Sequence, residues 1–195
     1  MELREEKKKR TFEYLRMEWI TVFILFLVIF STYYQSLFNN FVNLDDYGYV
    51  QENQYIRNLS LEGIYKIFTR PIMGNYFPLQ ILSYALDYKF WHIQPFCYHL
   101  TNVVLHIVNA ILVFFLLKKM FSNPLVSFLV ALFFGLHPIN VESVTWVAER
   151  KIVVCTFFFL SSYLTYLYYI NEEKRVRKRG FYVIGQDIAS AGITG

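Results

Sequence analysis

The sequence predicts an all-α integral membrane protein with about four transmembrane helices and one long loop after the first of them. Of its 195 residues, 55% are hydrophobic and only 17% are charged, a balance far from that of a soluble domain. Apolar runs of about 20 residues, the length that crosses a bilayer, recur along the chain. Basic residues flank these runs instead of sharing one soluble face, which argues against a nucleic-acid partner.

Four segments are expected to cross the membrane, and they are 19–38, 98–117, 124–136 and 152–170. The first follows a basic stretch and is longer than the core of a signal peptide, so we interpret it as an uncleaved anchor. The second ends at Lys118 and Lys119, and the fourth is followed by KRVRKR. The third is short and needs its flanks to span the bilayer.

The distribution of Lys and Arg predicts that both termini are cytoplasmic. The cytoplasmic parts are then segment 1–18, turn 118–123 and the basic tail 171–195, and the non-cytoplasmic loops are 39–97 and 137–151. We expect a multi-pass protein of a bacterial inner membrane or of the endoplasmic reticulum.

Helical periodicity occurs twice in the long loop. Leu61, Ile64, Tyr65 and Phe68 have the spacing of one helix face, and PLQILSYALDYKFW repeats a similar spacing from Pro78. Two short amphipathic helices at the membrane interface satisfy both patterns. A small folded soluble cap satisfies them equally well.

Other parts of the chain carry weaker signals. After Arg179 the sequence is rich in small residues and has no amphipathic period, which predicts a tail and not a domain. Cys97 and Cys155 have no metal-binding spacing and are interpreted as packing residues. Asn58 lies in the sequon NLS of the long loop, so it is expected to be modified in a host that glycosylates such sites.

Two adjacent carboxylates, Asp45 and Asp46, follow the first apolar run in the stretch NFVNLDDYGYV. Adjacent side chains cannot point the same way, so one is expected to act chemically while the other orients a neighbour. An interfacial Asp beside aromatic residues can have a raised pKa, which suits a general base at neutral pH. The alternative is a helix-capping pair without chemistry.

The short loop HPINVESVTWVAERK concentrates candidate head-group ligands, and these are His137, Glu142, Trp146, Glu149 and Arg150. If the segment after the proline is helical, Glu142, Trp146 and Glu149 share one face. Acids, a base and an aromatic ring at a membrane surface suit a head group that bears phosphate. The alternative is an interfacial loop with ordinary aromatic and charged anchors.

The second span carries a polar stripe of His99, Asn102, His106 and Asn109. Because lipid offers no hydrogen-bonding partner, the stripe must face other helices or a wet cavity. We interpret Asn102 and Asn109 as interhelical hydrogen-bonding residues and expect His99, near the loop, to reach the site. A proton relay through His99 and His106 is disfavoured because no acidic residue lies inside a span.

Four stretches together resemble one family, and they are FVNLDDYGYV, NYFPLQILSYALDYKFW, PFCYHLTNVVLHIVNAILVFFLL and ALFFGLHPINVESVTWVAERK. Their order resembles the N-terminal region of GT-C type membrane glycosyltransferases allied to protein O-mannosyltransferases, in the group with C-terminal tetratricopeptide repeats. The resemblance covers about residues 19–170 and implies a partial GT-C fold.

The resemblance also implies an activity and its site. The expected reaction transfers a sugar, mannose by analogy, from a polyprenyl-phosphate-linked donor to an acceptor hydroxyl on protein. Asp45 and Asp46 match the catalytic acidic motif of the first loop in that superfamily. The polar residues of the second loop match His137, Glu142, Glu149 and Arg150. The implied partners are membrane lipid, the lipid-linked donor and a protein acceptor.

The chain departs from the family pattern in two places. Relatives continue the second-loop motif with an acid, where this chain has Ile152 after AERK, so participation of a divalent metal stays open. Family members also have more spans and usually a repeat domain, so an N-terminal fragment is expected. The competing hypothesis is a non-catalytic membrane subunit that binds a polyprenyl-phosphate head group or scaffolds a partner.

Overall fold

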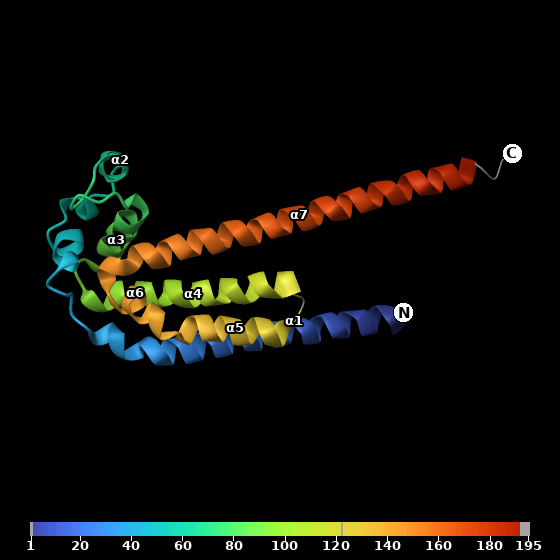
Figure 1. Cartoon of the computed structure of the whole chain (residues 1–195), viewed down its shortest axis with the longest axis horizontal. Helices are drawn as coiled ribbons and strands as arrows, with labels where there is room; N and C mark the ends of the chain where they lie inside the picture. The colour runs from blue at the N-terminus through green and yellow to red at the C-terminus, as the bar shows by residue number, and fades with distance from the viewer. Residues whose placement is uncertain (1, 122, 192–195) are drawn as a thin grey trace.

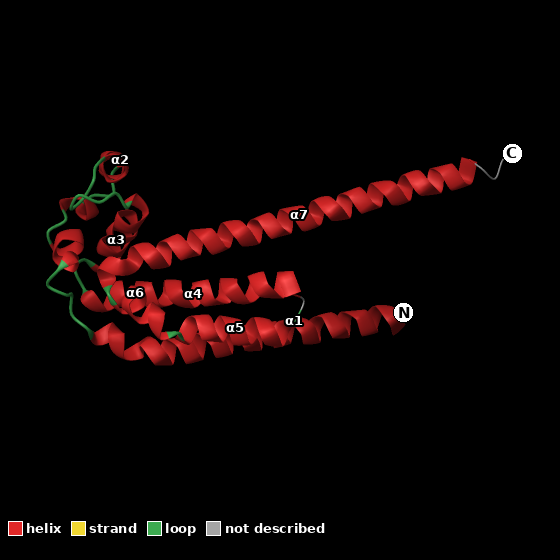
Figure 2. Ribbon diagram, in the orientation of Figure 1, coloured by secondary structure: helices red, strands yellow, loops and turns green. Residues whose placement is uncertain are grey.

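The computed structural model describes residues 2–121 and 123–191, and these residues form helices joined by loops, without a strand (Figure 2). The α-helices are α1 (Glu2–Tyr33), α2 (Leu61–Thr69), α3 (Pro78–Trp91), α4 (Pro95–Phe121), α5 (Pro124–Leu136), α6 (Val141–Thr145) and α7 (Arg150–Ala191). Short 3-10 or π-helical turns occupy Tyr34–Phe38, Tyr47–Gln51, Gln54–Arg57, Pro138–Asn140 and Val147–Glu149. In Figure 1, α1, α4, α5 and α7 run along one long axis, while α2 and α3 gather at the end away from both termini.

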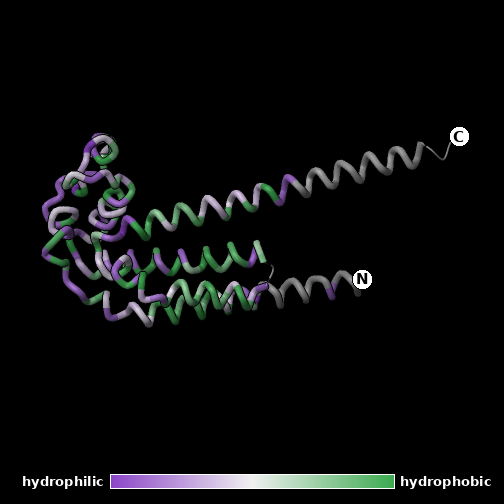
Figure 3. The backbone as a smooth tube through the Cα atoms, viewed as in Figure 1, coloured by the Kyte–Doolittle hydropathy of each residue, from purple (hydrophilic) through white to green (hydrophobic). Residues whose placement is uncertain are grey.

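The predicted all-α membrane fold is confirmed. Within residues 2–121 and 123–191, three stretches are long and apolar enough to cross a bilayer, and they are Arg16–Phe38, Pro95–Phe121 and Val147–Glu173. The 13 residues of α5 extend only about 20 Å, and a fourth span results when α5 is joined with Pro138–Thr145 across a 47° bend. Figure 3 shows hydrophobic residues along the long helices and many hydrophilic ones at the end that carries α2 and α3.

The two periodic segments of the long loop are the helices α2 and α3. Ser60 caps α2, since its hydroxyl accepts a hydrogen bond from the N–H of Gly63 at 3.2 Å. α3 begins at Pro78, a residue preorganised for the first helical position, and has no side-chain cap. At the other end of the chain, the main chain of α7 stays helical through the expected tail as far as Ala191.

Helix α4 is the centre of the bundle and packs against α1, α5 and α7. All four residues of its polar stripe are buried. The side-chain amide of Asn109 donates to the carbonyl of Val153 in α7 at 2.9 Å, and Nε2 of His106 lies 3.0 Å from the carbonyl oxygen of Gly135 in α5. The expected interhelical role of Asn109 is therefore confirmed, and such bonds satisfy polar groups that lipid cannot.

Apolar side chains form two separate cores. The bundle core joins α1, α4, α5 and α6 and contains Leu25, Ile29, Tyr33, Leu37, Val103, Ile107, Ala110, Phe114, Ala131 and Val144. The second core lies in the loop end, hereafter the cap, which is made of residues 41–91 with 146–149. Its buried members include Tyr49, Val50, Ile56, Ile67, Ile81, Tyr84, Ala85, Val147 and Ala148. Both loops of the chain thus build one folded unit.

Gly135 lets α1 and α5 approach closely, and Gly135→Leu is expected to destabilise the protein by about 1–3 kcal/mol through overpacking. A Cβ atom at Gly135 would lie 2.4 Å from Cδ1 of Ile29. Unfolding in detergent micelles followed by circular dichroism measures the effect. Val130→Leu, on an exposed position of α5, is the matched control. If the contact is the cause, adding Ile29→Ala restores part of the stability, and failure to do so contradicts it.

Candidate functional site

Asp46 joins the two loops of the cap. Its side chain is completely buried, Oδ2 accepts from the N–H of Val42 at 2.9 Å, and Oδ1 accepts from the N–H of Ala148 at 2.7 Å. Burial raises the pKa of Asp46, and the two backbone hydrogen bonds oppose this rise. Because both carboxylate oxygens are engaged, Asp46 fixes the position of the first loop against the second.

Asp45 has a different environment. Its side chain is partly exposed, and it has no hydrogen-bonding partner among the described residues. Asp46 precedes the π-helical turn Tyr47–Gln51 without making a side-chain cap bond to it, so the capping alternative is wrong for Asp46. Of the two acids, Asp45 is the one whose side chain is accessible at the surface.

Arg150 is the most heavily bonded side chain of the site. It is completely buried, and its Nη1 forms an ion pair with Oδ2 of Asp87 at 2.6 Å. Its Nε donates to the side-chain oxygen of Asn102 at 2.6 Å, Nη2 donates to the carbonyl of Tyr98 at 2.8 Å, and Nη1 also reaches the hydroxyl of Ser83 at 3.1 Å. Such a planar fork of donors suits a fixed cluster of acceptors. The guanidinium thus ties α7 to α3 and α4.

Asp87 is the acidic partner in this cluster. Its second oxygen, Oδ1, accepts from the hydroxyl of Thr101 at 2.9 Å. Burial raises the pKa of Asp87, while the charge and hydrogen bonds of Arg150 and the bond from Thr101 oppose the rise. The guanidinium also lies over the ring of Tyr84, 4.5 Å from its centroid, a favourable cation–π contact.

The other expected head-group ligands are scattered over the cap and its border. Glu142 is exposed, and Trp146 packs against the cap core. His137 is partly buried, and its Nδ1 accepts from the N–H of Ile139 at 3.2 Å. His99 is 1% exposed, so its ring is closed off from the surface of the cap.

The expectation of one helical face for Glu142, Trp146 and Glu149 is wrong. Helix α6 ends at Thr145, Trp146 has extended φ and ψ angles of −93° and 122°, and a new turn starts at Val147. The break turns the main chain so that the N–H of Ala148 can meet Asp46. Glu149 instead forms an ion pair with Lys151 at 2.6 Å.

A pocket of about 610 Å³ lies between the start of α3 and the first three turns of α7. Its lining is Tyr76, Phe77, Pro78, Leu79, Gln80, Lys151, Val154, Cys155, Phe158, Phe159 and Ser162. Most of these side chains are apolar, and Lys151 supplies the positive charge at one end. Among the described residues, no three His, Cys, Asp or Glu side chains gather as a metal site.

Sequence reasoning missed the polar face of α3. Gln80, Ser83 and Asp87 follow one another at three and four residues and all hydrogen-bond toward the start of α7. Their spacing is that of one helix face, so the signal was present within an apolar segment. Lys151 was visible in the short loop, but its place in a pocket depends on packing.

The chain is similar to several curated proteins. It is 30% identical to Protein O-mannosyl-transferase TMTC3 of Mus musculus over 155 residues, which are 74% of this chain and 16% of that protein. It is 34% identical to Protein O-mannosyl-transferase TMTC1 of Mus musculus and 38% identical to Protein O-mannosyl-transferase tmtc2 of Xenopus laevis, each over 93 residues. These matches cover 47% and 48% of this chain and 10% and 11% of the relatives, respectively.

The chain therefore spans 16% or less of the length of these relatives. No family model matches the chain. No solved structure matches it either.

Proposed function

Because the chain is a relative of the protein O-mannosyl-transferases, we propose that it carries the acidic site of a membrane glycosyltransferase. The proposed reaction moves a sugar from a polyprenyl-phosphate-linked donor to a hydroxyl group on a protein. A lipid-linked donor keeps its chain in the bilayer and its sugar at the interface, where the cap meets the bundle. The alternative of a non-catalytic subunit would keep this fold without turnover.

The observation that supports this proposal is that the two acids differ in burial and in hydrogen bonding. Asp46 is buried and bonded at both oxygens, while its neighbour Asp45 is partly exposed and has no hydrogen-bonding partner within the described part of the chain. A general base needs such an accessible carboxylate held in a fixed place. Asp46 holds the loop that carries Asp45 in place, because its carboxylate accepts a hydrogen bond from Ala148 in the second loop.

The proposed step is a displacement at the anomeric carbon. The acceptor oxygen forms a bond to that carbon while its proton passes to the carboxylate of Asp45. The bond from the anomeric carbon to the phosphate oxygen breaks, and the electron pair leaves with the polyprenyl phosphate. We propose that His137 and Glu142 contact the head group from the accessible side, while His99, Trp146, Glu149 and Arg150 support the loop from within.

A transfer assay tests the proposed function. The full chain in liposomes is incubated with a Ser- and Thr-containing peptide and with either radiolabelled polyprenyl-phosphate mannose or the nucleotide-linked sugar. The label is expected to reach the peptide from the lipid-linked donor alone. Absence of transfer from either donor supports the non-catalytic alternative, and transfer from the nucleotide sugar contradicts the proposed donor.

We propose that the cap faces away from the cytoplasm, and Asn58 offers a test of this orientation. Asn58 is exposed in the cap within the sequon NLS. In microsomes, the wild-type chain is expected to gain one glycan, removable by an endoglycosidase, because the modifying enzyme acts on luminal segments. Asn58→Gln is the control that should lack this glycan. Labelling of cap residues by a cytosolic impermeant reagent would contradict the orientation.

A further inference from the structure

We propose that the pocket between α3 and α7 binds the phosphate, sugar and first isoprenoid units of the polyprenyl-phosphate-linked donor. This inference rests on the proposed function and assigns its donor to specific residues. The pocket combines an apolar wall, a cation, an uncapped helix start and an unpartnered buried acceptor. Each of these matches one part of such a lipid.

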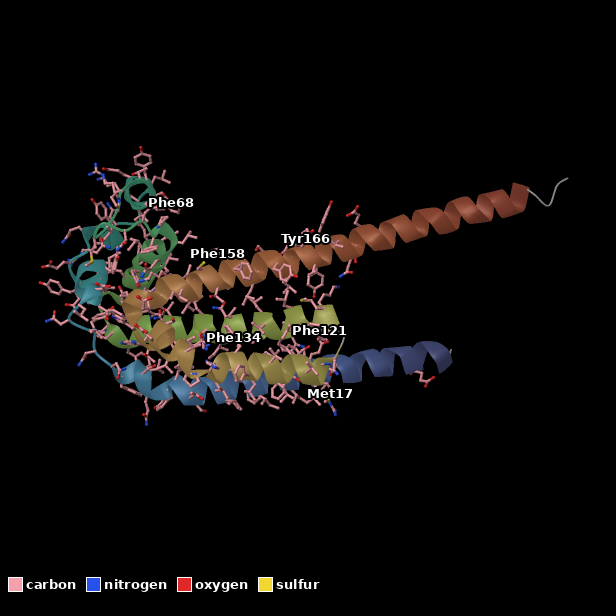
Figure 4. The ribbon with its side chains drawn as sticks, viewed as in Figure 1. Met17, Phe68, Phe121, Phe134, Phe158 and Tyr166 are labelled. Atoms are coloured by element: carbon pink, nitrogen blue, oxygen red, sulfur yellow. The ribbon has the colours of Figure 1, made fainter. Side chains whose placement is uncertain are left out.

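The apolar wall suits the isoprenoid chain. Val154, Cys155, Phe158 and Ser162 line the pocket along α7, and the 12 residues from Lys151 to Ser162 extend about 16 Å along the helix axis. Cys155 is exposed and Phe158 is 50% exposed, so both surfaces are accessible to a ligand. Figure 4 places Phe158 on the part of α7 close to the cap. The groove therefore leads from the cap into the transmembrane part of α7.

The end of the pocket formed by Lys151 and the start of α3 suits a phosphate. The ammonium of Lys151 donates one hydrogen bond to Glu149 and has three donors in all, so two stay available. The first α3 bond runs from the N–H of Ile81 to the carbonyl of Phe77 at 3.1 Å, and α3 has no side-chain cap. The N–H groups of Leu79 and Gln80 thus lack helical acceptors, and such a helix start favours an anion.

Gln80 suits a sugar hydroxyl. It is 2% exposed, and its Nε2 donates to the carbonyl of Ala148 at 2.6 Å and to the hydroxyl of Tyr84 at 2.7 Å. Because a carbonyl can only accept, these bonds fix the orientation of the amide. Its Oε1 is then a buried acceptor to which none of the described residues donates. A sugar hydroxyl would donate to it, whereas the choline head group of phosphatidylcholine has no hydroxyl to donate.

The pocket is directly connected to the acidic loop. Gln80 binds the carbonyl of Ala148, and Asp46 binds the N–H of the same residue. One residue of the second loop therefore separates the proposed sugar contact from the acid that positions Asp45. Ala148 thus links the proposed sugar contact to the loop that carries the proposed base.

Equilibrium binding of radiolabelled polyprenyl-phosphate mannose to the full chain in phosphatidylcholine nanodiscs tests the inference. Lys151→Gln removes the cation and Cys155→Trp fills the groove, and each is expected to weaken binding by about tenfold or more. Lys89→Gln changes an exposed lysine at the far end of α3 and is expected to stay within about twofold of wild type. Circular dichroism checks that every variant keeps its helix content.

The outcomes separate this inference from the proposed function. Unweakened binding by both Lys151→Gln and Cys155→Trp overturns the pocket assignment, as does equal competition by phosphatidylglycerol. Asp45→Asn is expected to bind the donor as wild type does while it fails to transfer the sugar. If the wild-type chain binds the donor but transfers no sugar, the pocket assignment is retained and only the proposed enzymatic activity is contradicted.

Discussion

Asp45→Asn is expected to lower sugar transfer by about 10²–10⁴-fold while the fold is retained, which is the usual contribution of a positioned general base. The amide keeps the size of the carboxylate but cannot take the proton of the acceptor hydroxyl. Because the carboxylate of Asp45 has no hydrogen-bonding partner among the described residues, its replacement removes no structural contact. The transfer assay and the melting temperature are measured on the same preparation.

Glu62→Gln is the matched control for Asp45→Asn. Glu62 is a cap carboxylate with an exposed side chain, paired with Lys66 four residues along α2. Such a surface pair contributes little, so both transfer and stability should stay at the wild-type level. Wild-type transfer by Asp45→Asn itself would exclude Asp45 as the base and leave Glu142, an exposed acid of the second loop, as the next candidate.

Arg150→Ala is expected to lower the free energy of unfolding by about 3–5 kcal/mol, because it leaves a buried charge without its partner. Asp87 would lose its ion pair, and Asn102, Ser83 and the carbonyl of Tyr98 would lose a donor. The pKa of Asp87, already raised by burial, would rise further without the guanidinium. Unfolding in detergent micelles followed by circular dichroism measures the loss.

Two comparisons show whether the destabilisation by Arg150→Ala comes from breaking the buried cluster or from the loss of a positive charge in general. Lys151→Ala removes the neighbouring cation, whose partly exposed pair with Glu149 should contribute under about 1 kcal/mol. The double variant Arg150→Met with Asp87→Leu removes both charges and should recover much of the stability. A cost below about 1 kcal/mol for Arg150→Ala alone would show that the cluster does not hold α7 to α3 and α4.

The fold could be predicted because its signals are local in the sequence. Apolar length and the basic flanks predicted a helical membrane protein with about four spans, and the described residues contain three candidate spans, or four when the bent pair counts as one. Pro78 and the apolar spacing after it predicted α3, and Asn109 was correctly assigned to a contact between helices. Each of these signals lies within one helix or one turn of the chain.

The site could be predicted only in part, because its contacts are distant in the sequence. Arg150 was expected at a phosphate, yet its side-chain partners lie 48 to 67 residues away in α3 and α4. No local sequence pattern indicates these partners. The break at Trp146 contains neither glycine nor proline. The helical spacing of Glu142, Trp146 and Glu149 in the sequence therefore gave no sign of it. The acidic pair was recognised, but which acid is buried depends on Ala148, 102 residues further along.

The short helix α5 has a consequence for the surrounding lipid. Its straight part extends about 20 Å, against a hydrocarbon thickness of about 30 Å. Where this straight part alone faces lipid, neighbouring acyl chains would shorten or tilt to match it, which is a local thinning of the bilayer. Lipid head groups beside this helix would sink toward the membrane midplane, which lowers the distance that a phosphate must travel to enter the protein from the side.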